Sequence, residues 1–126
     1  RLVLYAPSVM TIDSANSSAG TTSLMVKLGK RIKQAIATLD EFAALDHPCR
    51  VTRPKGMEEW GSCEKLESPT RFVIRVHHKL PDDWALYTLV HEWAHALSWS
   101  DDPLVENHGA EWGVAYARCY QAIFDP

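Results

Sequence analysis

The stretch LVHEWAHAL, residues 89–97, contains two histidines and a glutamate at a spacing that decides how the rest of the chain is interpreted. On an α-helix, residues four apart are separated by about 40° around the axis and about 6 Å along it, so His91 and His95 can bind one ion. Glu92 lies three residues before His95, from where its carboxylate can reach a water molecule at that ion without being a ligand. This HExxH spacing predicts a metal site with a general base.

The sequence around the histidines has the periodicity of a helix. Residues 80–83 (LPDD) favour a helix start, because acidic groups stabilise the N-terminus, and residues 100–103 (SDDP) favour its end. One apolar stripe is expected, made of Leu86, Val90, Trp93 and Leu97. The opposite arc carries Thr88, His91, Glu92, His95 and Ser98. We therefore predict a helix with one packing face and one functional face; the alternative is an ordinary packing helix with two unrelated histidines.

A catalytic zinc site usually has three protein ligands and a fourth position for water, so a further ligand must come from elsewhere. The candidates downstream are Asp101, Glu106, His108 and Glu111. Asp101 would complete the pattern HExxHxxxxxD, but that pattern relies on a glycine where this chain has Ser98. Asp101 is therefore the weaker candidate.

His108 leads into a second helical stretch and is the candidate that we prefer. Its periodic apolar positions are Trp112, Ala115, Cys119 and Ala122. Because His108 continues this stripe at its N-terminal end, we expect the imidazole to face the core near the other two histidines. Glu106 and Glu111 remain alternatives, and Glu111 could instead orient a ligand or Arg118.

Composition sets the broad class of the protein. The chain has 126 residues, 46% of them hydrophobic, and we expect residues 1–126 to form a single domain with its own core. The net charge of −3 gives no overall attraction to nucleic acid or anionic membranes. We expect no membrane association, because no stretch approaches the roughly 20 apolar residues of a membrane-spanning helix. Three cysteines without a CxxC pair favour a reducing, cytoplasmic setting, with a disulfide between two of them as the alternative.

The first half of the chain predicts one strand, one loop and one helix. Residues 1–6 favour a strand, and residues 11–23, rich in Ser, Thr, Ala and Gly, favour a flexible loop. Residues 24–39 have helical periodicity, with Ser23 as the expected N-cap. The outer face of this helix carries Lys27, Lys30, Arg31 and Lys33. This basic face could contact nucleic-acid phosphates, although a solvated surface is the simpler interpretation.

Two further strands are expected at residues 49–53 and 71–77. In the second, apolar and polar residues alternate, which predicts one buried face. We expect this strand to lie at a sheet edge, where a peptide substrate could add as another strand, or where Arg71 and Arg75 protect the edge. We expect His47, His77 and His78 to be loop or surface residues and not ligands.

The residues His91-Glu92-Trp93-Ala94-His95, followed by HGAEW at 108–112, resemble the SprT-like zinc metallopeptidases, whose motif is HExxH and then HGxEF or HGxEW. The WGSC segment at 60–63 is similar to that of the related YgjP-like peptidases. The resemblance covers roughly residues 60–120. It implies an α+β, minimal zincin-like domain, in which a small, mostly antiparallel sheet packs with helices including the HExxH helix.

The resemblance also implies a zinc ion (Zn²⁺) bound by His91, His95 and His108, and cytoplasmic proteolysis with Glu92 as general base. Cys63, at a position where the family has a cysteine, is expected to be a small packing residue. Residues 1–126 contain neither the C-terminal zinc ribbon of many SprT proteins nor a strongly basic tail.

The expected function is therefore zinc-dependent hydrolysis of peptide bonds in a protein or peptide substrate, with DNA-associated proteins as one candidate class. The candidates for the oxyanion donor are Tyr87, Tyr116 and Arg118. The alternatives are a protein-binding module with a structural zinc and a nucleic-acid adaptor that uses the basic helix face.

Overall fold

The computed structural model describes residues 2–4 and 25–126, which form an α+β fold. The strands are β1 (Leu2–Leu4), β2 (Met25–Val26), β3 (Cys49–Pro54), β4 (Gly61–Leu66) and β5 (Arg71–Val76). The helices are α1 (Lys30–Phe42), α2 (Asp82–Leu97) and α3 (Ala110–Phe124). The predicted loop at residues 11–23 lies outside the described part, and β1 falls within the strand predicted at residues 1–6. The expected α+β class is confirmed.

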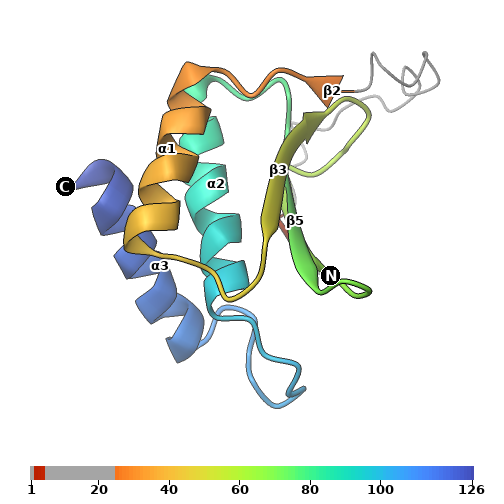
Figure 1. Ribbon diagram of the computed structural model, residues 1–126, viewed down its shortest axis with the longest axis vertical. Helices are drawn as coiled ribbons and strands as arrows, with labels where there is room; N and C mark the ends of the chain where they lie inside the picture. Colours follow the sequence, from red (N-terminus) through yellow and green to blue (C-terminus); the bar gives the residue numbers. More distant parts are fainter. Residues whose placement is uncertain (1, 5–24) are drawn as a thin grey trace.

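The strands form one mixed sheet with the order β1-β4-β5-β3-β2. Its centre consists of β4, β5 and β3, where β4 and β5 are antiparallel and β3 and β5 are parallel. The short strands β1 and β2 add antiparallel to β4 and β3 at the two edges. All three helices lie on one face of the sheet (Figure 1). The sheet is therefore mostly antiparallel, as expected, with β3 and β5 as its parallel pair.

Strand β5 has the predicted alternation but not the predicted position. Phe72, Ile74 and Val76 are buried, whereas the residues between them are half-buried. The strand pairs with β4 on one side and β3 on the other, so the expectation of an edge strand is wrong. Strand β4 is not predicted from its sequence, because GSCEKL has few of the β-branched and aromatic residues that favour strands.

Helix α2 is the central element, packed between the sheet and the other two helices. Leu86, Val90 and Trp93 are buried as expected, and Trp93 Nε1 donates a hydrogen bond of 2.8 Å to the carbonyl oxygen of Ala43 at the end of α1. Members of the predicted functional face are buried as well, namely Thr88, Glu92 and His95. A helix covered on nearly all sides places its polar groups in a water-poor environment, which raises the energetic cost of each unpaired one.

Helix α1 begins later than its periodicity predicts. It starts at Lys30, after Gly29 with φ of 85°, because the preceding Met25–Val26 pairs with β3 as a strand. The prediction that Ser23 caps the helix is therefore wrong, because Gly29 is the residue before its first turn. Ser23 itself lies outside the described residues. The periodicity itself is confirmed, because the apolar positions Ile32, Ala35 and Leu39 are buried.

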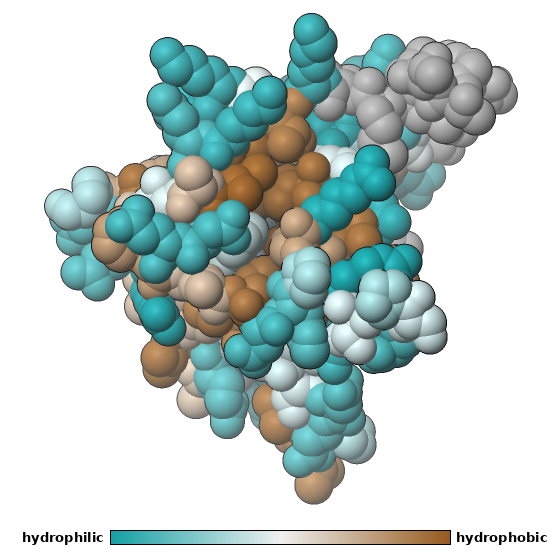
Figure 2. Space-filling view, viewed as in Figure 1, coloured by the Kyte–Doolittle hydropathy of each residue, from teal (hydrophilic) through white to brown (hydrophobic). Residues whose placement is uncertain are grey.

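Buried residues of α1, the central sheet, α2 and α3 belong to one hydrophobic cluster. Figure 2 shows hydrophobic side chains gathered near the middle of one face of the molecule, with hydrophilic side chains around them. Within the described ranges, none of the helices has the length and apolar character needed to cross a membrane.

Candidate metal centre

Three imidazoles from two parts of the chain converge at the end of α2. His91 and His95 lie one turn apart on α2, and His108 lies in the loop just before α3. The Nε2 atom of His95 lies 3.2 Å from that of His91 and 3.1 Å from that of His108. The third edge, from His108 to His91, is 3.2 Å. The three nitrogen atoms thus form a nearly equilateral triangle.

This triangle has the dimensions of one face of a tetrahedral metal site. Zinc–nitrogen bonds of 2.0–2.1 Å at tetrahedral angles separate the nitrogens by about 3.3–3.4 Å. The observed edges are within a few tenths of an ångström of that value. Three neutral imidazoles cannot satisfy three such contacts by hydrogen bonds alone without turning lone pairs toward one another. The three histidines therefore lie close enough to hold a metal ion, and a shared cation would remove the repulsion.

Burial keeps two of these imidazoles in the neutral form that a metal requires. It lowers the pKa of His91 to about 4, with a smaller contribution from neighbouring His108. The pKa of His95 falls to about 3 by burial and by the nearby His91 and His108. Neutral imidazoles offer a lone pair at neutral pH.

His108 reaches this cluster in a way that the sequence did not predict. Its imidazole lies beside those of His91 and His95 as expected, but the residue is an exposed part of the loop, so the expectation that it is turned into the core is wrong. Ala115 and Cys119, two turns and more further on, are buried as predicted. His108 is therefore held beside the other histidines by the approach of α3 to α2, while one side of it stays open to solvent.

Trp112, predicted as a packing position and as the last residue of the HGAEW motif, contacts all three histidines. Its ring centroid lies 5.0 Å from that of His91, 5.5 Å from His95 and 4.8 Å from His108. Its Nε1 also donates a hydrogen bond of 3.4 Å to the backbone carbonyl oxygen of His91. A large aromatic ring four residues after a candidate ligand is the sequence signal that could have identified this role.

Glu92 is fully buried, and neither of its carboxylate oxygens has a hydrogen-bond partner among the described residues. Burial raises its pKa to about 8. An unpartnered buried carboxyl group is costly to the fold, so its presence on the residue that follows His91 of the candidate metal group points to a functional role.

Gly61 of β4 makes room for this carboxyl group. A Cβ atom at Gly61 would come within 2.5 Å of Thr88 Cγ2 and 3.1 Å of Glu92 Oε2. The strand therefore approaches α2 more closely than a residue with a side chain would permit. The WGSC segment, singled out only by its resemblance, thus has a packing reason for its glycine.

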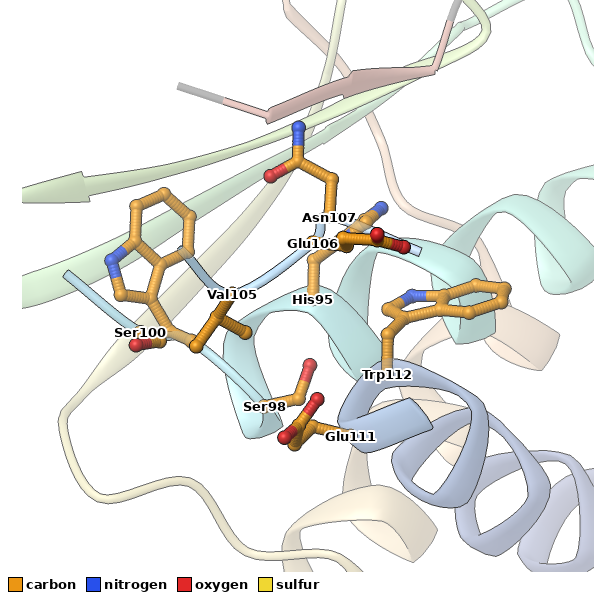
Figure 3. Close-up of a pocket in the computed structure, with 9 residues that line it drawn as sticks. His95, Ser98, Ser100, Val105, Glu106, Asn107, Glu111 and Trp112 are labelled. Carbon is orange, nitrogen blue, oxygen red and sulfur yellow. The ribbon is translucent and has the colours of Figure 1, made fainter. Parts of the chain in front are cut away.

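The other candidate ligands do not join the cluster. Asp101 is exposed, forms an ion pair of 3.1 Å with Lys65, and accepts a hydrogen bond from Trp99. Glu106 and Glu111 are exposed and line a small cavity of about 70 Å³ beside His95. In Figure 3, the carboxyl group of Glu111 points toward Ser98, at the opposite end of the cavity from Asn107. Within the described ranges, only the three histidines form a group with metal-binding geometry.

The structure also places the expected Glu111–Arg118 pair and the candidate oxyanion donors Tyr87 and Tyr116. Arg118 donates its Nε hydrogen to the carbonyl oxygen of Phe42, and so does not need Glu111 as a partner. Among the expected oxyanion donors, Tyr116 has its ring centroid 6.5 Å from that of His91, whereas Tyr87 packs on Phe124.

The remaining histidines and the cysteines have structural surroundings. His47, His77 and His78 lie in loops, as expected; His77 is buried there, and the other two are half-buried. All three cysteines are free, so the alternative of a disulfide is not realised. Cys63 is buried as a packing residue, and burial raises the pKa of its thiol far above the usual range.

No family model, curated protein or solved structure matches the chain. The interpretation of the site therefore rests on its geometry and chemistry.

Proposed function

We propose that the protein is a zinc-dependent metallopeptidase with a zincin-like, SprT-like domain, in which His91, His95 and His108 hold Zn²⁺ and Glu92 is the general base. The observation that carries this proposal is the triangle of Nε2 atoms, together with a buried carboxyl group on the residue that follows His91, which has no hydrogen-bond partner among the described residues. Three protein ligands leave a position for water, which is the arrangement of catalytic zinc sites.

The chemistry divides between the ion and Glu92. When bound, zinc supplies Lewis acidity that lowers the pKa of a coordinated water toward about 7 and polarises the scissile carbonyl group. Glu92 takes the proton from the attacking water and passes it to the leaving amine. Burial, which raises the pKa of Glu92 to about 8, favours a carboxyl group that can hold the proton between these two transfers. Trp112 fixes the rings of the three ligands by packing against each of them.

A Glu92→Gln substitution tests this assignment, because the amide has nearly the same shape but cannot accept the proton. We expect the variant to bind one zinc per chain, measured by elemental mass spectrometry. We expect its cleavage of fluorescently labelled, unfolded casein to fall by at least about 100-fold. A variant that keeps full activity would remove Glu92 from the mechanism and favour the protein-binding module with a structural zinc.

The nucleic-acid adaptor is less well supported than the peptidase. Lys27, Lys30 and Lys33 are exposed, but Arg31 on the same face is paired with Asp83 at 2.8 Å and with Asp82 at 3.8 Å. Action on DNA-associated proteins and a cytoplasmic location remain expectations of the resemblance. Binding to DNA that weakens steeply with salt, and is lost when the three lysines are changed to glutamine, would support the first of these.

A further inference from the structure

A row of aromatic side chains runs along the contact between α2 and α3, starting at the metal centre. Its positions on α2 are 84 and 87, and on α3 they are 112, 116, 120 and 124, a spacing that places each set on one face of its helix. We call this row, together with the tryptophan before β4, the aromatic seam. Its members are Trp60, Trp84, Tyr87, Trp112, Tyr116, Tyr120 and Phe124.

The seam is continuous with the candidate site. His91 lies 5.0 Å from Trp112 and 6.5 Å from Tyr116, measured between ring centroids. Trp112 stacks on Tyr116 at 4.9 Å, and Tyr116 is followed by Tyr120 at 6.0 Å. Tyr120 in turn lies 4.8 Å from Phe124. A molecule lying along α3 on these rings therefore comes directly to the three histidines.

The α2 part of the seam extends it toward the sheet. Tyr87 stacks on Phe124 at 4.6 Å and on Tyr120 at 6.5 Å. Trp84 packs edge-on against Tyr87 at 6.1 Å and against Trp60 at 5.4 Å. Trp60 directly precedes Gly61, the first residue of β4, which lies against Glu92. The seam therefore also reaches the candidate site from the side of the sheet.

The rings of the seam remain accessible to water despite these contacts. Trp84 is 52% exposed, Tyr87 is 40% exposed and Tyr120 is 39% exposed. They make up half of the exposed large hydrophobic side chains in the described part of the chain. Exposed aromatic groups that form one contiguous surface, instead of being scattered singly, are typical of binding sites.

The charges beside the seam indicate what it binds. Its sequence neighbours on the two helices and at their ends are acidic, namely Asp82, Asp83, Glu111 and Asp125. Two arginines offset part of this charge, namely Arg31, which pairs with Asp82 and Asp83, and Arg118 on α3, so these six residues carry a net charge of about −2. Such surroundings repel a phosphate backbone and favour a partner with positive charge.

We propose that the aromatic seam binds the apolar side chains of an extended, positively charged polypeptide segment. The binding itself does not depend on the proposed function, but the identification of the bound segment as the substrate rests on it. The seam then sets specificity: it selects segments with large apolar side chains and brings them to the three histidines. Rigid, partly exposed aromatic rings suit this task, because little conformational entropy is lost when a side chain packs on them.

Binding can be measured without turnover in the zinc-loaded Glu92→Gln chain. The probes are two peptides of equal charge, one with repeating Lys-Phe-Gly and the other with repeating Lys-Ser-Gly, and a single-stranded thymidine oligonucleotide. We expect the Phe peptide to bind at least about fivefold more tightly than the Ser peptide by fluorescence anisotropy. We expect the oligonucleotide to bind more weakly than the Phe peptide.

Single substitutions locate the binding surface. Tyr87→Ala and Tyr120→Ala should each remove most of the preference for the Phe peptide, while Tyr87→Phe should keep it. Val114→Ala is the matched control, since Val114 is 74% exposed on α3 but is not a member of the seam. Circular dichroism and zinc content confirm that each variant is folded and loaded.

The outcomes separate this inference from the proposed function. Equal affinity for the two peptides, an equal loss in Val114→Ala, or tighter binding of the oligonucleotide would overturn the seam as a polypeptide site. The proposal would also be overturned if the wild-type chain sediments as a dimer and the Tyr87→Ala chain as a monomer, because the seam would then be a contact between two copies of the chain. If the wild-type protein cleaves both peptides at equal rates, the proposed peptidase activity is supported and the role of the seam in specificity is rejected. If the Phe peptide is bound selectively but never cleaved, the seam is supported as a binding site and the peptidase activity is rejected.

Discussion

Two groups of histidines lie in this small protein, and they differ in what their nitrogen atoms face. In the first, the Nε2 atoms of His91, His95 and His108 point at one another across 3.1–3.2 Å. In the second, His77 and His78 stack with nearly parallel rings at 5.0 Å, and His77 Nδ1 accepts a hydrogen bond of 2.9 Å from the Lys79 backbone.

The second group is also fixed by a buried cation. Arg53 donates hydrogen bonds to the carbonyl oxygens of His77, His78 and Leu80, at 2.8–3.2 Å. The first group instead has Glu92 beside it, a buried carboxyl group with no hydrogen-bond partner among the described residues. Both groups include histidines with a pKa lowered by burial, so a low pKa alone does not distinguish them. The two groups differ in the convergence of the three Nε2 atoms and in the buried carboxyl group of Glu92, whose oxygens have no hydrogen-bond partner among the described residues.

The largest expected effect comes from removing one histidine from each group. His108→Ala should abolish stoichiometric zinc binding and peptide cleavage, because two imidazoles cannot complete the site. His78→Ala, the matched control, should keep both. Zinc content by elemental mass spectrometry and a melting temperature measured with and without chelator check this. Full zinc binding by the His108→Ala chain would break the contrast between the two groups.

A smaller effect is expected where the sheet approaches Glu92. Gly61→Ala should lower the free energy of unfolding by about 2–3 kcal/mol, because the new methyl group overlaps Thr88 and presses on Glu92. Gly113→Ala is the control, since a Cβ there meets nothing within 4 Å, and it should be neutral or stabilising. Urea denaturation measures both. Equal stability of the two variants would mean that the sheet tolerates a wider separation from α2.

The smallest expected effect is a pH dependence that belongs to the second group. Burial first, and then nearby His78, Lys79 and Arg53, lower the pKa of His77 to about 4 from its usual 6.5. The unfolded chain therefore takes up a proton at higher pH than the folded chain does. The contribution of neutral His77 to stability is fully present above pH 6.5, and it is lost as the pH falls toward 4.

By pH 5 this loss should amount to about 1–2 kcal/mol. Protonation at Nδ1 would also end the hydrogen bond from the Lys79 backbone. The measurement is the free energy of unfolding of zinc-loaded wild type and of His77→Gln between pH 7 and pH 5. Parallel curves for the two proteins would show that another group titrates instead.

The sequence predicted well what depends on local spacing. The helical spacing of His91 and His95 predicted that they lie together on one helix, and the periodicity that continues through Ala115 and Cys119 predicted α3, which His108 precedes by two residues. Alternation predicted the buried face of β5 in the same way.

What the sequence did not reveal depends on contacts between distant segments. β4 has weak strand propensity and is held by its pairing with β5, so its local composition gave no signal. The start of α1 was displaced because residues 25 and 26 pair with β3. The close approach of Gly61 to Glu92, and the contact of Trp112 with all three histidines, arise only when the sheet and the helices come together.

The position of His108 outside the helices has a consequence for metal exchange. It lies 13 residues beyond His95, at the end of an irregular connection, whereas the other two histidines of the candidate site lie one turn apart on α2. An ion held by all three therefore closes this connection into a ring and anchors the first turn of α3 to α2. Its departure would start at His108, so the amide protons of residues 98–109 should report metal occupancy by their exchange with solvent before the rest of the protein loosens.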